Sequence, residues 1–393
     1  MMIMTGGRRT MANSKLKRVD INALLDKDVN EMSLRDISEM WSGVIGAPLL
    51  YHDFVPYEIL SVVVGPMITV KGAPIKRPNL YTLKISPPGI GLKSTVLGAE
   101  LSVVERFEYV KWTGLGSPEG LIDFVIDEQG NSILIFEEEF SKTMGDKKDY
   151  RAGFDKILIA LHDGIGGKFS YSKAGLIVRR EIPPGQYVCC WASDHPQFYD
   201  RRFWGGGLGR RMIGLVAYEN DNWQPYIRED DARERIILKT QRWVRVISER
   251  VEDGVVIRFS PNAATVINAI NKEVTGGGGY YFISATDFIA KIAVFNAVAR
   301  GSMEVEKRDV LRADWLIQRA GNSFRPIIEG GEDFYAVLGK VARYLVEVRP
   351  GEWIPIRDVY KNLKKPAKTV KEAVNKLSKI KVKGDRVGYN VEE

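Results

Sequence analysis

A Gly- and Pro-rich run of ten residues, Ser86–Thr95, has the residue types of a loop that wraps a phosphate chain. Its glycines let several backbone N–H groups turn toward one anion, its lysine supplies an ammonium, and a hydroxyl after the lysine can hold Mg²⁺. The run follows the apolar segment Leu80–Ile85, which is typical of a β-strand. The candidate nucleotide-binding residues are Pro88, Gly89, Ile90, Gly91, Leu92, Lys93, Ser94 and Thr95, with Ser94 and Thr95 also as candidate metal ligands.

The run departs in one respect from the usual phosphate-binding motif, GxxxxGK[ST]. Counted back from Lys93, Leu92 stands where the second glycine belongs and Pro87 where the first belongs. A Gly/Pro-rich structural turn is therefore the alternative interpretation.

A second chemical feature lies further along the chain, where the apolar run Ile133–Phe136 is followed by three glutamates and Phe140. In P-loop ATPases, a carboxylate at such a strand end helps to hold Mg²⁺ and the next one polarises the attacking water. Counted from the strand, Glu137 holds the metal and Glu138 is catalytic. Aligned on Phe140, the same two roles fall to Glu138 and Glu139. The register stays open, and an acidic surface turn is the alternative.

Polar side chains also follow the apolar run Tyr187–Ala192. A strand at this place in such ATPases presents a polar group to the γ-phosphate and the attacking water, which Ser193 or Asp194 would do here. His195 is interpreted as a loop residue and not as a base, because phosphoryl transfer mostly needs positioning and charge neutralisation. Arg210 is the candidate arginine finger, a group that acts from a neighbouring subunit, and a surface salt bridge is its alternative role.

The apolar runs predict the sheet that would position these residues. Short β-rich runs alternate with helical segments through residues 81–218, the pattern of a mainly parallel sheet with loops at its strand ends. The expected strands are Leu80–Ile85, Ile133–Phe136, Leu176–Val178, Tyr187–Trp191 and Met212–Val216.

Helical segments flank this region on both sides. Ser33 and Asp36 are placed to cap a helix that runs through Met40, and a second helix is expected over Tyr57–Val64, after Pro56. Later in the chain, Asp253-Gly254 is a candidate hairpin turn. Three later helices would form a small lid: one after Ser260-Pro261, one over Ala285–Arg300 and one over Asp309–Ala320.

Composition limits the class of protein to which these elements belong. The chain has 393 residues, of which 45% are hydrophobic and 27% charged, as in an ordinary soluble globular protein of two or three domains. Cys189 and Cys190 are adjacent within an apolar run, which excludes a disulfide framework and a zinc site and favours the cytosol. No apolar stretch approaches the ~20 residues that span a bilayer. Residues 1–20 are expected to form a flexible basic tail.

The net charge of +7 is concentrated near the C-terminus, because residues 334–393 hold 14 Lys and Arg against 7 Asp and Glu. Helical spacing over Phe334–Val348 and Ile356–Leu363, a third helix from Thr369, and two β runs, Ile380–Val382 and Val387–Val391, fit a winged helix-turn-helix that binds DNA. A protein-docking module with a solvated basic face is the alternative. The candidate DNA-binding residues here are Lys371, Lys376, Lys379, Lys383 and Arg386.

The stretch from Tyr81 to Val216 resembles the AAA+ motor of the minichromosome maintenance (MCM) helicases, and less closely a group of phage and plasmid ATPases. The likeness covers about a third of the chain. It is carried in order by residues 113–121 (TGLGSPEGL), 127–130 (DEQG), 138–142 (EEFSK), 171–176 (YSKAGL), 192–196 (ASDHP), 199–200 (YD) and 208–211 (LGRR).

The resemblance implies ATP and Mg²⁺ as cofactors and a ring of identical subunits, expected to be a hexamer. It also implies a DNA-gripping hairpin, with Lys173 facing the DNA and Lys168 and Arg179 as further contacts. The family's large N-terminal domain with its zinc-binding cysteines is expected to be absent. The family's sensor asparagine is replaced by Asp194 or Ser193, and Leu92 alters the phosphate-binding loop.

The expected fold is α/β: an AAA+ P-loop domain with a parallel sheet and helices on both faces, a helical lid and a C-terminal winged helix-turn-helix. The expected divisions are 1–20, 21–220 for the ATPase core, 221–330 for the lid and 334–393 for the winged helix. The expected function is ATP-driven DNA translocation or unwinding in the cytoplasm, in association with the nucleoid. The alternatives are an ATP-switched DNA-binding assembly that does not unwind and a scaffold that does not hydrolyse ATP.

Overall fold

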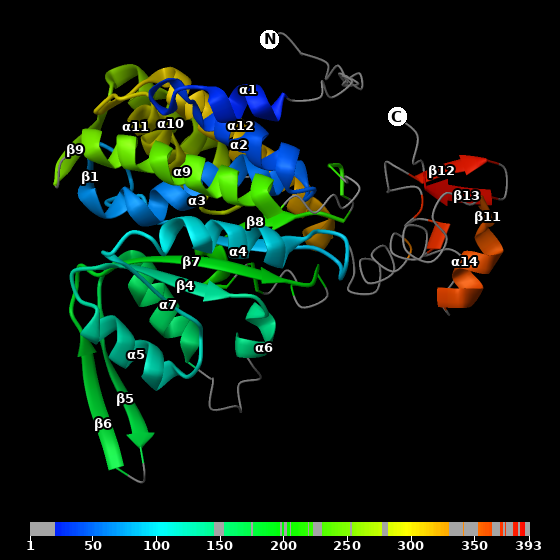
Figure 1. Ribbon diagram of the computed structural model, residues 1–393. Helices are drawn as coiled ribbons and strands as arrows, with labels where there is room; N and C mark the ends of the chain where they lie inside the picture. Colours follow the sequence, from blue (N-terminus) through cyan, green and yellow to red (C-terminus); the bar gives the residue numbers. More distant parts are fainter. Residues whose placement is uncertain are drawn as a thin grey trace, which may run out of the picture.

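A computed structural model gives the arrangement of these elements (Figure 1). The structure describes residues 20–393 except for several stretches. These are 145–152, 174–175, 197–198, 200–202, 205, 219, 223–229, 252–253, 277–281, 330–340, 342–352, 364–369, 372–373, 375–379, 384–385 and 390–393.

A five-stranded sheet lies at the centre of the molecule, and all of its strands are parallel. The neighbouring strands over Tyr81–Ile85 and Tyr187–Asp194 are buried along their whole length, which explains why they appear in the sequence as largely apolar runs. The predicted parallel sheet is therefore confirmed. In spatial order the strands are β3 (Val110–Thr113), β4 (Ser132–Glu137), β7 (Tyr187–Asp194), β2 (Tyr81–Ile85) and β8 (Ile213–Val216).

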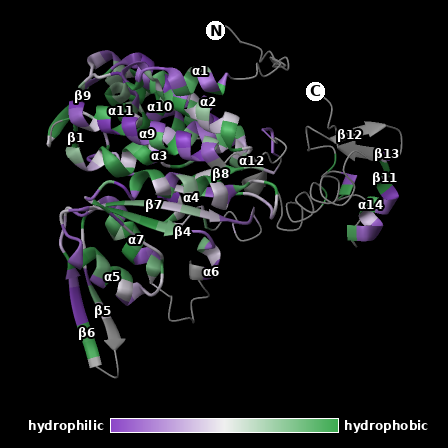
Figure 2. Cartoon of the chain, viewed as in Figure 1, coloured by the Kyte–Doolittle hydropathy of each residue, from purple (hydrophilic) through white to green (hydrophobic). Residues whose placement is uncertain are grey.

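Helices cover both faces of this sheet, as predicted (Figure 1). One face carries α3 (Leu49–Val63) and α4 (Lys93–Val104), with α9 (Asp230–Arg250) packed on α4. The other face carries α5 (Pro118–Asp127), α6 (Phe140–Met144) and α7 (Phe154–Asp163). Between these layers, β4 is coloured mainly as hydrophobic in Figure 2. The fold is thus α/β, with parallel sheets flanked by helices.

The order of the strands defines where a ligand is expected to bind. β2 lies between β7 and β8, so the chain crosses over β2 when it passes from β7 to β8. In open α/β sheets, ligands bind outside the carboxyl ends of the strands, at the point where the strand order changes direction. The loop after β2 and the end of β7 lie side by side at this place.

The N-terminal helices begin as their capping residues predict, with one correction. α1 (Ile21–Asp26) and the 3₁₀ turn η1 (Val29–Glu31) precede α2 (Leu34–Val44), where Ser33 and Asp36 form a capping box. The second helix does not start after Pro56: α3 begins at Leu49 and contains the proline. Almost every residue of α3 is buried, and this packing outweighs the backbone hydrogen bond that proline cannot donate.

The elements after residue 220 pack against those before it. α12 (Lys307–Glu329) contacts β8, and α9 contacts α2 as well as α4 within one continuous hydrophobic core. The start predicted at Ser260-Pro261 is confirmed, because Ser260 caps α10 and Pro261 is its first residue. The remaining elements are α10 (Pro261–Thr275), α11 (Ala285–Ala299), and a second sheet of β1 (Ile68–Lys71), β9 (Val255–Phe259) and β10 (Glu304–Val305), with η2 (Gly65–Met67) before β1.

Two predictions of strand pairing were wrong. Gly254 precedes β9, but β9 pairs in parallel with β1 and β10, so no hairpin forms there; Asp253 lies outside the described residues. The run Leu176–Val178 belongs to β6 (Leu176–Ile182), which is not part of the central sheet but pairs with β5 (Gly167–Lys173) in a separate antiparallel hairpin, where the resemblance predicts one. A local sequence pattern predicts that a segment is extended, but it does not name the strand with which the segment pairs. The hairpin projects from the body below α5 (Figure 1).

The C-terminal segment contains a small antiparallel sheet and a helix. The helix α14 (Ile356–Leu363) has the bounds that the sequence predicts. The sheet has the order β11 (Ile354–Pro355), β13 (Arg386–Tyr389) and β12 (Ile380–Lys383), so two extended runs are confirmed. Most of the helix expected over 334–348, and the start of the helix expected at Thr369, lie outside the described residues.

The described helices include none that is both apolar enough and long enough to cross a bilayer. Cys189 and Cys190 are buried in β7 as core residues, as expected.

Candidate nucleotide site

The loop Ser86–Leu92 connects the end of β2 to the start of α4, and both of its glycines are required by its geometry. Gly89 has a φ of +78°, a conformation that side-chain-bearing residues rarely adopt. A Cβ atom on Gly91 would lie 2.1 Å from Ser86 Oγ and 3.3 Å from the hydroxyl of Tyr51. The start and the end of the loop therefore touch, and the backbone closes on itself.

This closure indicates how the loop corresponds to the phosphate-binding motif. Counted forward from the end of β2, Ser86 and Gly91 occupy the two glycine positions of GxxxxG. Leu92 is then one additional residue before Lys93, rather than a replacement for a glycine. Among the described residues, Leu92 is also the only one other than glycine with a positive φ, at φ 44° and ψ 31°. An extra residue in the left-handed conformation lets the loop close and still lead into α4.

The N-terminus of α4 is open to an anion. Leu92 occupies the cap position and provides no side-chain hydrogen bond, so the N–H groups of the first turn have no side-chain cap. Such groups, together with the helix dipole, bind phosphate in many proteins. Ser94 is exposed and Thr95 is half-buried on this same turn.

The ammonium of Lys93 lies at the mouth of the loop. Its Nζ is 3.4 Å from the carbonyl oxygen of Ser86 and 3.4 Å from Nδ1 of His195. Burial lowers the pKa of Lys93, while the negative charges of Asp194, Glu138 and Glu139 act in the opposite direction. These three carboxylates therefore favour the charged form of Lys93.

The three glutamates after β4 differ in what they contact. Glu137 is half-buried, and its Oε2 accepts a hydrogen bond from the backbone N–H of Leu115 at 3.0 Å. Glu138 and Glu139 are exposed, and the hydrogen bond from Lys142 to Glu139, with an N–O distance of 2.6 Å, lowers the pKa of Glu139. Glu137 is engaged by the N–H of Leu115, whereas the charges of Glu138 and Glu139 act on the pKa of Lys93, which favours the register aligned on Phe140.

Asp194 is the last residue of β7, and its carboxylate accepts hydrogen bonds from neighbouring groups. It accepts hydrogen bonds from the Tyr199 hydroxyl at 2.7 Å, from the His195 N–H at 2.7 Å, and from the N–H of Ser141. These bonds fix the start of α6 and the turn after β7. Ser193 is similarly engaged, since its hydroxyl donates to the carbonyl of Glu138 at 2.8 Å.

The sequence did not single out His195 for this site. Its Nδ1 lies 3.2 Å from the carbonyl oxygen of Ser86 as well as beside the Lys93 ammonium. The signal that could have identified it is positional: β7 is the direct neighbour of β2, so the first residue after β7 lies next to the loop. His195, and not Asp194, reaches the lysine.

Arg210 lies far from Lys93 within one chain. It belongs to the 3₁₀ turn η4 (Gly209–Arg211), directly before β8, and is exposed. β8 runs parallel to β2 with Ile213 opposite Thr82, so Arg210 is at the amino edge of the sheet and Lys93 is beyond its carboxyl edge. With ~3.3 Å per residue, β2 alone separates the two edges by about 13 Å. Lys291 is also at the amino edge, where its Nζ donates to the carbonyl of Asn79.

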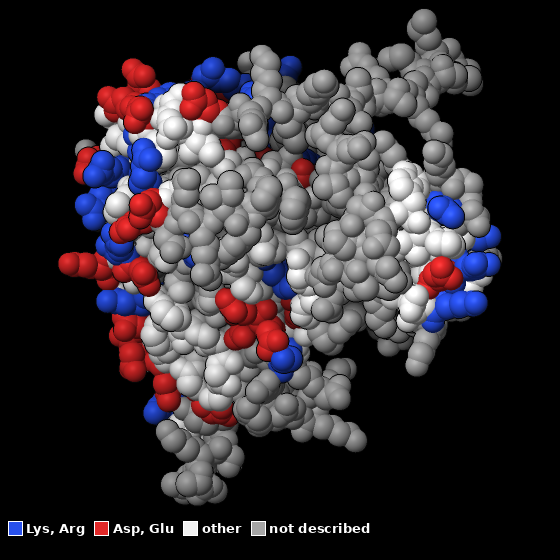
Figure 3. Space-filling view, turned by 45° about the vertical axis from the view of Figure 1, so that its right-hand side comes forward, with Lys and Arg blue, Asp and Glu red and all other residues white. Residues whose placement is uncertain are grey.

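The candidate DNA-binding residues fall on two surfaces. On the hairpin, Lys168 and Arg179 are exposed, with Lys168 Nζ 3.8 Å from Glu181. Lys173 ends β5, and its side chain lies outside the described part. Figure 3 shows basic side chains gathered over the C-terminal elements. Those exposed there include Lys371 and Arg386; Lys383 ends β12, and Lys376 and Lys379 lie outside the described residues.

Ser94, Thr95 and Glu138 are the candidate protein ligands for Mg²⁺ bound together with a triphosphate. The described residues form no cluster of three or more His, Cys, Asp or Glu side chains that would hold a metal alone. Mg²⁺ beside a triphosphate needs only one or two protein oxygens, because water and phosphate provide the rest. A hydroxyl of Ser94 or Thr95 and the carboxylate of Glu138 are oxygen donors of this kind.

No protein-family model matches the chain, and no curated protein matches its sequence.

Proposed function

We propose that this protein is an ATPase of the AAA+ type that moves along or unwinds DNA. The observation that carries the proposal is the closed loop from Ser86 to Gly91 with Lys93 at its mouth. The loop lies at the carboxyl edge of a parallel sheet, beside the end of β7. A structural turn would not need an ammonium directed at its mouth and flanked by carboxylates.

Each part of the site has a role in phosphoryl transfer. The loop N–H groups and the first turn of α4 would bind the phosphates, and Lys93 would contact the β and γ oxygens. Ser94 or Thr95 and Glu138 would hold Mg²⁺, which neutralises phosphate charge when bound. Glu139 would orient the attacking water. Glu137 is assigned to holding the Leu115 loop, because its carboxylate already accepts that N–H.

The remaining parts support an assembly that acts on DNA. Since Arg210 is at the opposite edge of the sheet from Lys93, it would serve the site of an adjacent copy, which favours a ring such as a hexamer. The hairpin β5–β6, with Lys168 and Arg179, and the basic C-terminal elements would contact the phosphate backbone of DNA.

ATP hydrolysis measured with and without single- and double-stranded DNA tests the proposal. The wild type should hydrolyse ATP faster with DNA, and both Glu138→Gln and Arg210→Ala should abolish the stimulated rate. Calorimetry separates binding from hydrolysis: Lys93→Ala should lose ATP binding, whereas Glu139→Gln, which removes only the group that orients water, should retain it. Equal and negligible ATP binding by the wild type and Lys93→Ala would refute the proposal.

One observation favours a second candidate function, an ATP-switched DNA-binding assembly without unwinding. Lys93 is engaged by Ser86 and His195, so ATP would have to displace these contacts, as in a switch. In that case ATP would drive assembly on DNA, the hydrolysis rate would be independent of DNA, and a strand-displacement assay would show no product.

A further inference from the structure

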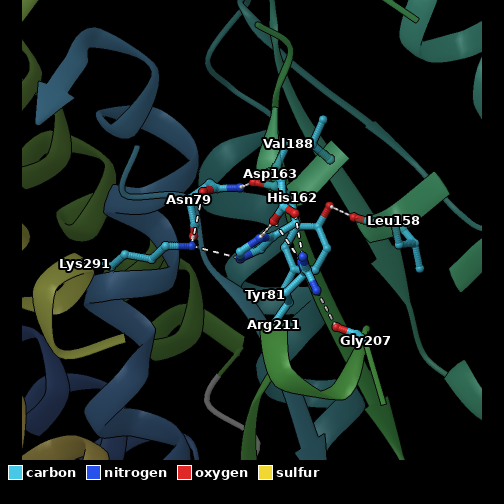
Figure 4. A network of polar contacts seen from close by, with 9 residues as sticks. All are labelled: Asn79, Tyr81, Leu158, His162, Asp163, Val188, Gly207, Arg211 and Lys291. Atoms are coloured by element: carbon cyan, nitrogen blue, oxygen red, sulfur yellow. Dashed lines mark hydrogen bonds and ion pairs between the residues drawn. The ribbon is translucent and has the colours of Figure 1, made fainter. Parts of the chain in front are cut away.

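A chain of polar side chains crosses the amino edge of the sheet beside η4 (Figure 4). Arg211 Nε and Nη2 donate to the two carboxylate oxygens of Asp163, at the end of α7, at 2.8 and 2.5 Å. Its third nitrogen, Nη1, donates to the carbonyl of Gly207 at 2.7 Å. Bidentate pairs of this kind fix the orientation of both partners.

Behind Asp163, the row of polar contacts continues into the core. His162 Nδ1 is 2.9 Å from Asp163 Oδ1, and His162 Nε2 is 2.9 Å from the ammonium of Lys291. An ammonium can only donate, so Nε2 accepts and the ring proton is on Nδ1, from which it is donated to Asp163. Burial lowers the pKa of His162 to about 3, which keeps the ring neutral in this tautomer. Asp163 is thus held from two sides, by the ring and by the guanidinium.

The turn that contains Arg210 and Arg211 is fixed by its backbone as well. A Cβ on Gly209 would lie 2.3 Å from the carbonyl oxygen of Phe203, so the turn packs directly on the preceding segment. The N–H of Arg210 donates to the carbonyl of Gly206 at 3.2 Å.

Successive side chains of a 3₁₀ helix point about 120° apart, because it has 3.0 residues per turn. When the bidentate pair holds Arg211 against the body, Arg210 is therefore directed away from Asp163. We propose that Asp163 is a positioning residue for Arg210: by holding Arg211, it fixes η4 so that Arg210 reaches the nucleotide site of the adjacent copy. This inference rests on the proposed function.

A mixing experiment tests this role. In the Asp163→Asn variant, the loop Ser86–Leu92 and Glu138 are intact, but Arg210 is misplaced. In the Glu138→Gln variant, Arg210 is in place, but the subunit cannot hydrolyse ATP. Asp163→Asn should bind ATP like the wild type and have a kcat about a hundredfold lower, the cost of misplacing a reacting group by roughly 1 Å. Glu138→Gln alone should be inactive.

In a ring mixed at random from equal amounts of the two variants, about a quarter of the interfaces join an intact site to a correctly placed arginine. The mixture should therefore regain about a quarter of the wild-type rate per subunit. A defect confined to the fold of the Asp163→Asn subunit would not be corrected by mixing.

The matched control is Asp309→Asn, which breaks another Arg–Asp pair, Arg300–Asp309 at 2.7 Å, away from η4. It should keep the wild-type kcat. If Asp163→Asn does not assemble, Arg211→Lys in the same mixing assay replaces it, since lysine keeps the charge but not the bidentate bond. If the wild type is active but Asp163→Asn has an unchanged kcat, the role of Asp163 is refuted and the proposed function stands. The same holds if the wild type is active but mixing restores no activity. An inactive wild type overturns the proposed function and this inference with it.

Discussion

A buried cluster of charges next to the loop Ser86–Leu92 makes the stability of the fold depend on pH. Lys84, on β2, donates to Glu58 of α3, with both N–O distances 2.7 Å, and to Glu100 of α4 at 3.0 and 3.2 Å. All three side chains are fully buried. Two carboxylates beside one ammonium leave an excess negative charge unless one carboxyl group keeps its proton.

Glu100 is the group that keeps the proton. Burial, followed by the negative charge of Glu58, raises the pKa of Glu100 well above its ordinary value of 4.5. In the unfolded chain the same group ionises near that ordinary value. The folded state therefore binds one more proton than the unfolded state across the pH range from about 4.5 up to the raised pKa. The stabilisation that it gives is complete below pH 4.5 and is lost as the pH rises through this range.

Glu100→Gln removes this dependence, because glutamine keeps the shape, the donor to Glu58 and the acceptor for Lys84 without a proton to lose. The free energy of unfolding of the wild type should fall relative to that of the variant by about 1.4 kcal/mol for each pH unit. The difference should therefore move in favour of the variant with each rise in pH, as long as the pH stays below the raised pKa of Glu100.

Urea denaturation at pH 5.5, 6.5 and 7.5 measures this difference. Glu105→Gln, at an exposed position directly after α4, is the control and should follow the wild type at each pH. If the wild type and Glu100→Gln remain parallel over the three pH values, the buried proton is not there and the reasoning is refuted.

Three further outcomes follow from the loop and the hairpin. Gly91→Ala should abolish ATP binding in calorimetry because its Cβ meets Ser86 Oγ, and adding Ser86→Gly should restore part of it; an unchanged affinity of Gly91→Ala would contradict the closed loop. Leu92→Gly should raise the free energy of unfolding by about 1 kcal/mol by relieving the left-handed conformation, whereas Leu92→Ala should not. Replacing both Lys168 and Arg179 with alanine should lower the slope of DNA affinity against salt by about 2, measured by titration at several salt concentrations, and an unchanged slope would exclude the hairpin from the DNA contact.

The sequence predicts the central sheet well, because strands buried on both faces must be apolar along their length. The run that becomes β2 and the run that becomes β7 are of this kind. β3 was missed because it is an edge strand of four residues in which only Val110 is buried and Trp112 is exposed. Its position is set by pairing with β4, which is information that its own residues do not contain.

The candidate site was predicted in part for a related reason. The types of residues that bind phosphate are visible in the sequence, but the correspondence with the motif depends on which loop residues touch. Counting back from Lys93 gives Leu92 as a substituted glycine, whereas the contact between Ser86 and Gly91 indicates an added residue. His195 reaches Lys93 only because β7 is next to β2, a neighbour relation set by the order of the strands.

The parallel direction of the strands separates the residues proposed to bind ATP and Mg²⁺ from the proposed arginine finger. Lys93 and Glu138 follow the carboxyl ends of β2 and β4, whereas Arg210 precedes the amino end of β8. Because all five strands are parallel, Arg210 and the loop Ser86–Leu92 lie at opposite edges of the sheet within one chain. In the proposed ATPase, a complete site therefore requires a second copy of the chain. The hydrogen bonds that Arg211 donates to Asp163 then lie in one subunit, and they affect catalysis at the site of the next subunit.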